Sequence, residues 1–262
     1  MNDATKMFTD GAAYERRMGR WSRMVGEVFL DWLAAPPGLR WLDVGCGNGA
    51  FTEVLIARCK PTAVGAVDPS EGQLSYARTR PGTKLAEFRL GDAQELPYAD
   101  RGFDAATMAL AISFIPDPLK AVREMMRVVR PGGAVATYMW DLPAGGIPVA
   151  PMYRALKSLG VTASMPGVEV TRREAMQKLW EQAGLRSIET RVILIQVAYA
   201  GFDDFWESYR VPEGPAGLAI RKMSPSEIEN LKARLREHLP IAADGTIAYE
   251  AFANAVKGRV PD

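Results

Sequence analysis

Hydrophobic and polar positions over the first 140 residues follow two alternating patterns. Short apolar runs predict strands, and the segments after them carry apolar residues at the spacing of one helix face. The first predicted strand lies in RWLDVGCGNG, where it breaks into glycines before the helical AFTEVLIARC. Four further strands are predicted at 62–67, 84–90, 103–110 and 133–140. Such alternation predicts a parallel sheet with helices on both of its faces.

The pattern changes after Trp140. The stretch DLPAGGIPVAPMY is rich in Pro and Gly and predicts a loop or lid rather than a strand. Thr171 and Glu174 then have the spacing of a capping box, which predicts a helix that Gly184 ends.

The last 80 residues add two strands and one helix to this prediction. A β-branched stretch at 187–199 predicts a sixth strand, and Ser224 with Glu227 predicts a capped helix running to about residue 239. The segment 245–257 supplies a last strand. We therefore expect one α/β domain over 1–262, with an N-terminal helical segment at 1–37, a core at 38–140 and the remainder at 141–262.

Composition and charge narrow the classes of function. The 262 residues carry 32 Lys plus Arg against 31 Asp plus Glu, a net charge of +1 that disfavours a nucleic-acid partner. No apolar run approaches the roughly 20 residues that a membrane-spanning helix needs. One His and two Cys are too few for the usual structural zinc sites, so no metal is expected. The low cysteine count and the absence of a signal peptide predict a cytoplasmic protein.

Three aspartates follow three successive predicted strands. Asp43, Asp68 and Asp92 are 25 and 24 residues apart, and each stands at the carboxyl end of its strand. These ends meet at one edge of a parallel sheet, where ligands of open α/β folds bind. Asp68 is placed to accept hydrogen bonds from ribose hydroxyls, and Asp92 from an exocyclic amine such as that of adenine. We therefore expect a nucleoside-containing ligand.

The glycine-rich loop after Asp43 leaves two ligand classes open. In Gly45-Cys46-Gly47, missing side chains allow a ligand to approach the backbone. Gly45, Gly47 and Ala50 also satisfy the dinucleotide fingerprint, so the spacing alone does not separate the classes. A carboxylate two residues before the first glycine disfavours a pyrophosphate there. It favours a cofactor that carries a sulfonium and an ammonium group.

Four ordered segments resemble one family. WLDVGCGNGAFTE, GAVDPSEGQL, GDAQELPYADRGFDAATMALAISFIPDP and REMMRVVRPGGAVATYMWD are similar to the motifs of class I S-adenosylmethionine-dependent methyltransferases. The similarity is strongest to the subgroup of ubiquinone and menaquinone biosynthesis enzymes and covers residues 38–140. It implies a Rossmann-like three-layer α/β sandwich, with a seven-stranded, mostly parallel sheet and an antiparallel last strand. It also implies S-adenosyl-L-methionine as cofactor, with S-adenosyl-L-homocysteine as product.

The resemblance assigns roles to single residues of the expected cofactor site. Asp43 and the loop Gly45–Cys46–Gly47 would surround the methionyl part, and Asp68 would hold the ribose. The remaining assignments are Pro69 beside the adenine, Asp92 with Ala93 at its amine, and Met108 with Ala109 under the methionine and the methyl group.

Two further features bear on the chemistry. Many relatives carry histidines after the fourth strand, where this chain has Ala111-Ile112-Ser113-Phe114, so the catalytic residues stay unknown. Tyr14 and Arg20 belong to a basic and aromatic segment. It is a solvated helix face, a nucleic-acid patch, or a lid in which those two residues could meet the methionine carboxylate.

The expected function is methyl transfer to a small-molecule acceptor by direct displacement. An NAD(P)-dependent oxidoreductase is the first alternative, because Tyr153 and Lys157 have the Tyr-x-x-x-Lys spacing of short-chain dehydrogenases. Methylation of RNA or protein and a non-catalytic cofactor-binding role also stay open. The acceptor and the oligomeric state cannot be predicted from the sequence.

Overall fold

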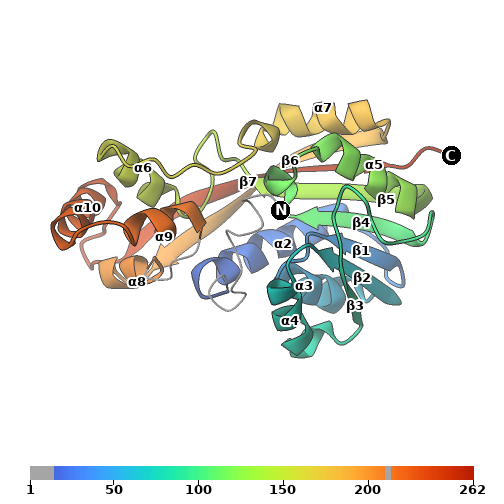
Figure 1. Cartoon of the computed structure of the whole chain (residues 1–262), viewed down its shortest axis with the longest axis horizontal. Helices are drawn as coiled ribbons and strands as arrows, with labels where there is room; N and C mark the ends of the chain where they lie inside the picture. Colours follow the sequence, from blue (N-terminus) through green and yellow to red (C-terminus); the bar gives the residue numbers. More distant parts are fainter. Residues whose placement is uncertain (1–14, 210–213) are drawn as a thin grey trace.

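The computed structural model describes residues 15–209 and 214–262, and its centre is a seven-stranded sheet of order β3-β2-β1-β4-β5-β7-β6 (Figure 1). Strands β1 to β5 run parallel, and β7 is inserted antiparallel between β5 and β6. The strands are β1 (Arg40–Val44), β2 (Ala63–Asp68), β3 (Ala86–Leu90), β4 (Phe103–Ala109), β5 (Val129–Trp140), β6 (Arg186–Tyr199) and β7 (Ile247–Arg259). The predicted fold class is therefore confirmed.

Helices cover both faces of the sheet (Figure 1). On one face lie α2 (Arg20–Leu33), α3 (Ala50–Cys59) and α4 (Glu71–Thr79), and on the other α5 (Pro118–Val128) and α7 (Arg173–Ala183). Neighbouring residues of one strand point to opposite faces of the sheet. Trp41 therefore packs in the core beneath α2 and α3, and Leu42 packs in the core beneath α5 and α7. On the second face, the indole of Trp180 donates a hydrogen bond to the Val135 carbonyl over 3.0 Å.

A group of helices gathers at one end of the long β6–β7 pair, on the left of Figure 1. They are α6 (Ala150–Ser158), α8 (Phe202–Glu207), α9 (Gly214–Ile220) and α10 (Pro225–His238). The predicted capping box of Ser224 and Glu227 opens α10, as expected. The segment expected as a loop or lid after Trp140 becomes helical from Ala150 onward, because α6 packs its apolar face against this group.

Short helical turns complete the described chain. They are a π-helical turn η2 (Glu15–Gly19) and the 3-10 turns η3 (Pro81–Thr83), η4 (Ile112–Phe114) and η5 (Glu169–Thr171).

The predicted capping box of Thr171 and Glu174 is wrong. Helix α7 begins at Arg173, and its N-cap residue Arg172 makes no side-chain cap. The Thr171 hydroxyl is buried instead, where it donates to the Val168 carbonyl over 2.7 Å and accepts from the Leu142 amide over 3.2 Å. This hydroxyl therefore holds the loop after β5 rather than the start of a helix. Gly184 ends α7 with φ +96°, as predicted.

Candidate functional site

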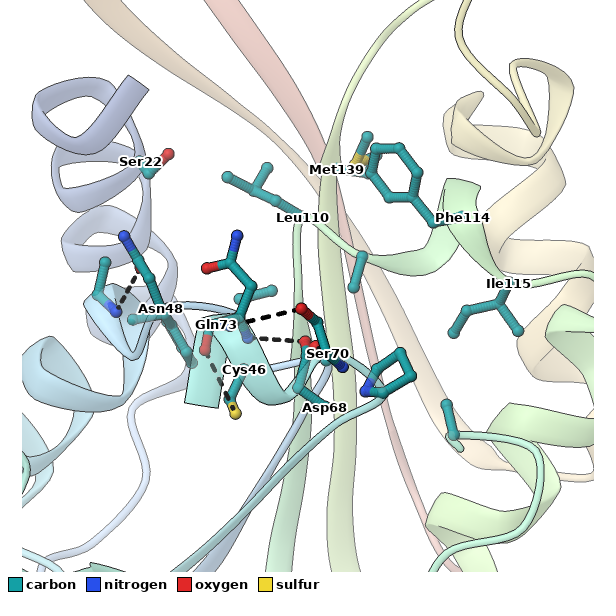
Figure 2. Close-up of a pocket in the computed structure, with 18 of the residues that line it drawn as sticks. Ser22, Cys46, Asn48, Asp68, Ser70, Gln73, Leu110, Phe114, Ile115 and Met139 are labelled. Atoms are coloured by element: carbon teal, nitrogen blue, oxygen red, sulfur yellow. Dashed lines mark hydrogen bonds between the residues drawn. The ribbon is translucent and has the colours of Figure 1, made fainter. Parts of the chain in front are cut away.

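A cavity of about 660 Å³ opens at the carboxyl ends of the parallel strands. Its volume lies within the range typical of small-molecule sites, about 300–1,000 Å³. The turns after β1, β2, β3 and β4 line it, together with the end of β5 and the first helical segment. Figure 2 shows Asp68, Ser70 and Gln73 on one side of this cavity and Phe114, Ile115 and Met139 on another.

The glycine loop between β1 and α3 forms one wall of the cavity. Gly45, Gly47 and Gly49 have φ of +69°, +51° and +77°, in the left-handed region that favours glycine. A Cβ on Gly45 would stand 2.6 Å from the Cβ of Ala111, whereas at Gly47 the nearest atom would be the Gln73 Oε1 at 4.0 Å. The backbone at Gly47 therefore presents an open cradle to a ligand, as the cofactor prediction requires.

Asp43 lies beneath this loop rather than in the cavity wall. Its carboxyl group is fully buried, and the Thr52 hydroxyl donates a hydrogen bond to Oδ2 over 2.6 Å. Oδ1 accepts no hydrogen bond from any residue in the described part of the chain. Burial raises the pKa of Asp43 to about 7, opposed by the Thr52 hydrogen bond and increased by the charge of Asp68. Asp43 thus places a titratable group behind the loop, where a nearby cation would favour its charged form.

Asp68 lines the cavity at the end of β2 and also holds the glycine loop. Its Oδ2 accepts a hydrogen bond from the Gly47 amide over 2.9 Å, and its Oδ1 accepts one from the Ser70 amide over 2.9 Å. Burial raises the pKa of Asp68, although both backbone hydrogen bonds act to lower it. Each oxygen can accept a further hydrogen bond, so a ribose hydroxyl can share this carboxylate with the loop.

Asp92 lines the cavity at the end of β3 but is exposed to solvent. Its Oδ1 accepts hydrogen bonds from the Gln94 amide over 2.8 Å and from the Gln94 side chain over 3.1 Å. The carboxylate therefore forms part of a local turn. Gln94, which we did not predict as a site residue, lines the cavity beside Asp92.

The thiol of Cys46 is buried in the cavity wall. Burial raises its pKa well above the usual range, and the charges of Asp43 and Asp68 act in the same direction. Cys46 therefore contributes a neutral, weakly polar surface beside the glycines.

The other predicted site residues divide between the cavity and its surroundings. Pro69, Ala93 and Ala109 line the cavity. Met108 does not line it, because its side chain is fully buried in the core beneath β4.

The two predicted residues of the N-terminal segment have different outcomes. The guanidinium of Arg20 stacks on the rings of Trp21 at 4.0 Å and Tyr199 at 4.7 Å, outside the cavity lining. Tyr14 lies outside the described residues.

We did not predict several of the residues that line the cavity. Ser22 and Gln73 are polar residues on helices, and Figure 2 shows both at the cavity. Gln73 could have been noticed, because Ser70 caps α4 and the cap fixes which residue of the first turn faces the strand ends. Leu110 lines the cavity with φ +56°, a left-handed conformation that nothing in the apolar pattern predicts.

Comparisons with known proteins agree with this geometry. The family described as "Methyltransferase domain" matches residues 42–137. The demethylmenaquinone methyltransferase of Renibacterium salmoninarum is 38% identical over 133 residues, which are 48% of this chain and 50% of that protein. The malonyl-[acyl-carrier protein] O-methyltransferase of Methylococcus capsulatus is 37% identical over 117 residues, 44% of this chain and 42% of that protein. The chain thus spans about half the length of these curated relatives.

Among solved structures, the YcgJ protein of Bacillus subtilis has a TM-score of 0.60 at 18% identity, over 91% of this chain and 99% of that one. At this identity the likeness concerns the fold. The family match and the relatives, rather than this likeness, identify residues 42–137 as a methyltransferase domain of the class I, S-adenosylmethionine-dependent type. The domain is similar to that of the menaquinone biosynthesis enzymes. The predicted family is confirmed, and the match supports the predicted cofactor.

Residues 15–209 and 214–262 contain no cluster of three or more His, Cys, Asp or Glu that could hold a metal ion. Within the same ranges, none of the helices has both the length and the apolar character needed to span a bilayer.

Proposed function

We propose that this protein binds S-adenosyl-L-methionine and transfers its methyl group to a small, uncharged, apolar acceptor by direct displacement. The main supporting observation is one continuous cavity with two unlike sides. Its first side combines the glycine backbone with the carboxylates of Asp68 and Asp92. Its second side is mostly apolar and includes Phe114, Ile115 and Met139.

On the first side, the chain can hold a nucleoside through its carboxylates and backbone. We assign Asp68 to the ribose hydroxyls and the side chains at Asp92 and Gln94 to the adenine edge. The open backbone at Gly47 would pass beneath the sugar and the sulfur, because no side chain stands there. Asp43 would act through its negative charge, from behind the loop, on a cationic cofactor.

On the second side, the chain excludes water and orients the acceptor. S-adenosyl-L-methionine, when bound, supplies a methyl group on a positively charged sulfur that is already a good leaving group. Holding the attacking atom in line with that methyl group therefore provides much of the rate acceleration. The apolar side chains of Leu110, Phe114, Ile115, Met139 and Val149 serve this positioning role.

The side chains of the cavity wall limit the acceptor. Among the described residues no His, Lys or Arg lines the cavity, so none of these lining side chains can neutralise a phosphate or carboxylate. The single histidine, His238, is exposed at the end of α10, with its Nδ1 2.8 Å from the Arg234 carbonyl oxygen. We infer that the acceptor carries no negative charge and that its attacking atom needs no histidine base. We also propose a cytoplasmic location, which the two free, buried cysteines favour.

Calorimetric titration tests this function at the level of the cofactor. The expected result is binding of both S-adenosylmethionine and S-adenosylhomocysteine, and no binding of NADH. A folded protein that binds neither sulfur compound would overturn the proposal. Binding of NADH instead would favour the oxidoreductase.

Acceptor binding needs a separate test. A panel of uncharged aromatic acceptors and their carboxylated counterparts is incubated with S-adenosylmethionine, and S-adenosylhomocysteine release is measured. We expect release only with uncharged members, reduced in Phe114→Ala while its S-adenosylhomocysteine affinity is unchanged. Preference for the carboxylated members would contradict the acceptor class.

A further inference from the structure

Arg80 is a nearly buried cation that does not line the cavity but contacts the elements around it. It follows directly after α4, and its side chain is only 10% exposed. Nε donates to the Asn48 carbonyl in the glycine loop over 2.7 Å. Nη1 pairs with Glu53 of α3 over 3.1 Å, and Nη2 pairs with Glu15 of η2. One guanidinium thus joins the end of α4 to η2 and to the contiguous glycine loop and α3.

The contact with Asn48 restrains the glycine loop. Gly47 and Gly49 on either side of Asn48 have left-handed backbones, and glycine loses more conformational freedom on ordering than any other residue. A charge-assisted hydrogen bond from Arg80 fixes the carbonyl between them and thereby orients the cradle.

The contact with Glu15 restrains a second part of the cavity wall. Glu15 begins the π-helical turn that contains Met18, and Met18 lines the cavity beside Ser22. The side chain of Asn48 also donates to the Glu15 carboxylate over 3.4 Å, so this carboxylate contacts both Arg80 and the loop. The N-terminal turn and the glycine loop are therefore joined through the same ion pair.

Arginine suits this position for a geometric reason. Its planar fork offers donors in several fixed directions, whereas a lysine ammonium is a point charge on a flexible chain. Lysine at position 80 could pair with one carboxylate but could not hold Glu15, Glu53 and the Asn48 carbonyl in the observed arrangement.

We propose that Arg80 is a positioning residue for cofactor binding, which fixes the glycine loop and the turn Glu15–Gly19 relative to each other from behind the cavity wall. The inference rests on the proposed function, because it assumes that the cofactor occupies the side of the cavity formed by the loop. Cofactor affinity then depends on a side chain that does not line the cavity.

The test compares Arg80→Lys with Arg78→Lys. Arg78 lies on the same helix and also pairs with a carboxylate, that of Glu71, but its side chain is 43% exposed, and its hydrogen bonds go to Glu71 and the Phe88 carbonyl rather than to the glycine loop. We expect S-adenosylhomocysteine to bind about tenfold more weakly to Arg80→Lys, the loss typical of a charge-assisted hydrogen bond. Arg78→Lys should bind like the unsubstituted protein. Thermal unfolding of each variant verifies that the titrated protein is folded.

Glu15→Gln tests the connection between the two walls without disturbing the core. The double variant Glu15→Gln/Arg80→Lys should lose less affinity than the product of the two single losses, since both substitutions disrupt one network. In hydrogen exchange, S-adenosylhomocysteine should protect residues 15–22 in the unsubstituted protein and not in Arg80→Lys. A purely structural role of Arg80 would leave that ligand-dependent protection intact.

The outcomes separate this inference from the proposed function. If the unsubstituted protein binds no S-adenosylhomocysteine, the proposed function fails. If it binds, but Arg80→Lys has an unchanged affinity or the two losses multiply, the positioning role of Arg80 is overturned and the function stands.

Discussion

The Thr52 hydroxyl donates a 2.6 Å hydrogen bond to the Asp43 carboxylate, and both side chains are completely buried. This contact joins the first turn of α3 to the end of β1, directly beneath the glycine loop. Because the carboxylate receives only this hydrogen bond within the described residues, its ionisation remains costly. The contribution of the Thr52–Asp43 pair beneath the loop to the free energy of unfolding therefore depends on pH.

Asp43→Asn should reduce the pH dependence of stability. The pKa of Asp43 is raised to about 7 in the folded protein from 3.8, so the folded state holds the proton more tightly than the unfolded state. The free energy of unfolding should consequently fall as pH rises, by about 3 kcal/mol from this group between about pH 5 and pH 8. The variant lacks that contribution, and urea unfolding of both proteins at the two pH values measures the difference. Equal slopes would contradict the assignment.

Thr52→Val should destabilise the protein more at high pH than at low pH. It keeps the shape of the side chain but removes the hydroxyl that stabilises the ionised Asp43. We expect a loss of about 1–3 kcal/mol near pH 8 and a smaller one near pH 5, measured by urea unfolding. Thr107→Val is the matched control, because the buried Thr107 hydroxyl donates to an uncharged carbonyl, that of Leu42. Its loss should not change with pH.

Asp68→Asn should weaken cofactor binding. The amide can replace only one of the two carboxylate acceptors now used by Gly47 and Ser70, and it loses the negative charge. We expect the dissociation constant for S-adenosylhomocysteine to rise about tenfold or more, which calorimetry measures. Asp100→Asn, on the exposed surface beside Arg127, provides the control. Retained affinity in Asp68→Asn would remove the ribose assignment.

Asn254→Ala should destabilise the sheet at its antiparallel strand. The buried Asn254 amide on β7 donates to the Asp141 carboxylate over 2.8 Å and to the Thr171 carbonyl over 2.9 Å. Its removal leaves two acceptors without this donor, and we expect unfolding to become easier by about 2–3 kcal/mol. Gln196→Ala, which removes an exposed hydrogen bond to Glu250, should cost less than about 0.5 kcal/mol. Chemical unfolding of both variants at one pH decides the comparison.

The sheet was predictable because its signal is local and repeated. Each apolar run before a turn defined a strand, and the aspartates at 43, 68 and 92 followed from the rule that parallel strands end at one edge. The boundaries moved by a few residues, as in β5, which starts at Val129 rather than at 133. The antiparallel position of the last strand came from the family resemblance.

Two segments with the same capping-box spacing formed different structures because their tertiary contacts differ. Ser224 and Thr171 both precede a glutamate by three residues, but only Ser224 is exposed and caps its helix. Thr171 is buried beside Leu142, whose amide donates a hydrogen bond to the Thr171 hydroxyl oxygen. Sequence spacing carries no information about such a distant partner.

The positions of single residues in the site also depend on contacts between residues that are far apart in the sequence. The sequence placed Asp43 and Met108 in the cofactor site, whereas the structure places one beneath the loop and the other in the core. The apolar wall formed by Leu110 and Phe114 depends on a left-handed backbone after β4 and on the 3-10 turn η4. Neither conformation has a marked pattern of apolar positions.

The insertion of β7 between β5 and β6 sets an order of assembly. Within the sheet, β6 is hydrogen-bonded to β7, so it is connected to the other strands only through β7. Strands β1 to β5 and the glycine loop can form earlier, because their partners precede β7 in the chain. During synthesis, the side of the cavity built by the first strands would thus exist before the walls supplied by Ile147 and Tyr153 are fixed. Non-local pairing of this kind is slow, so we expect the β5–β7 pairing to form later than the pairings among β1 to β4.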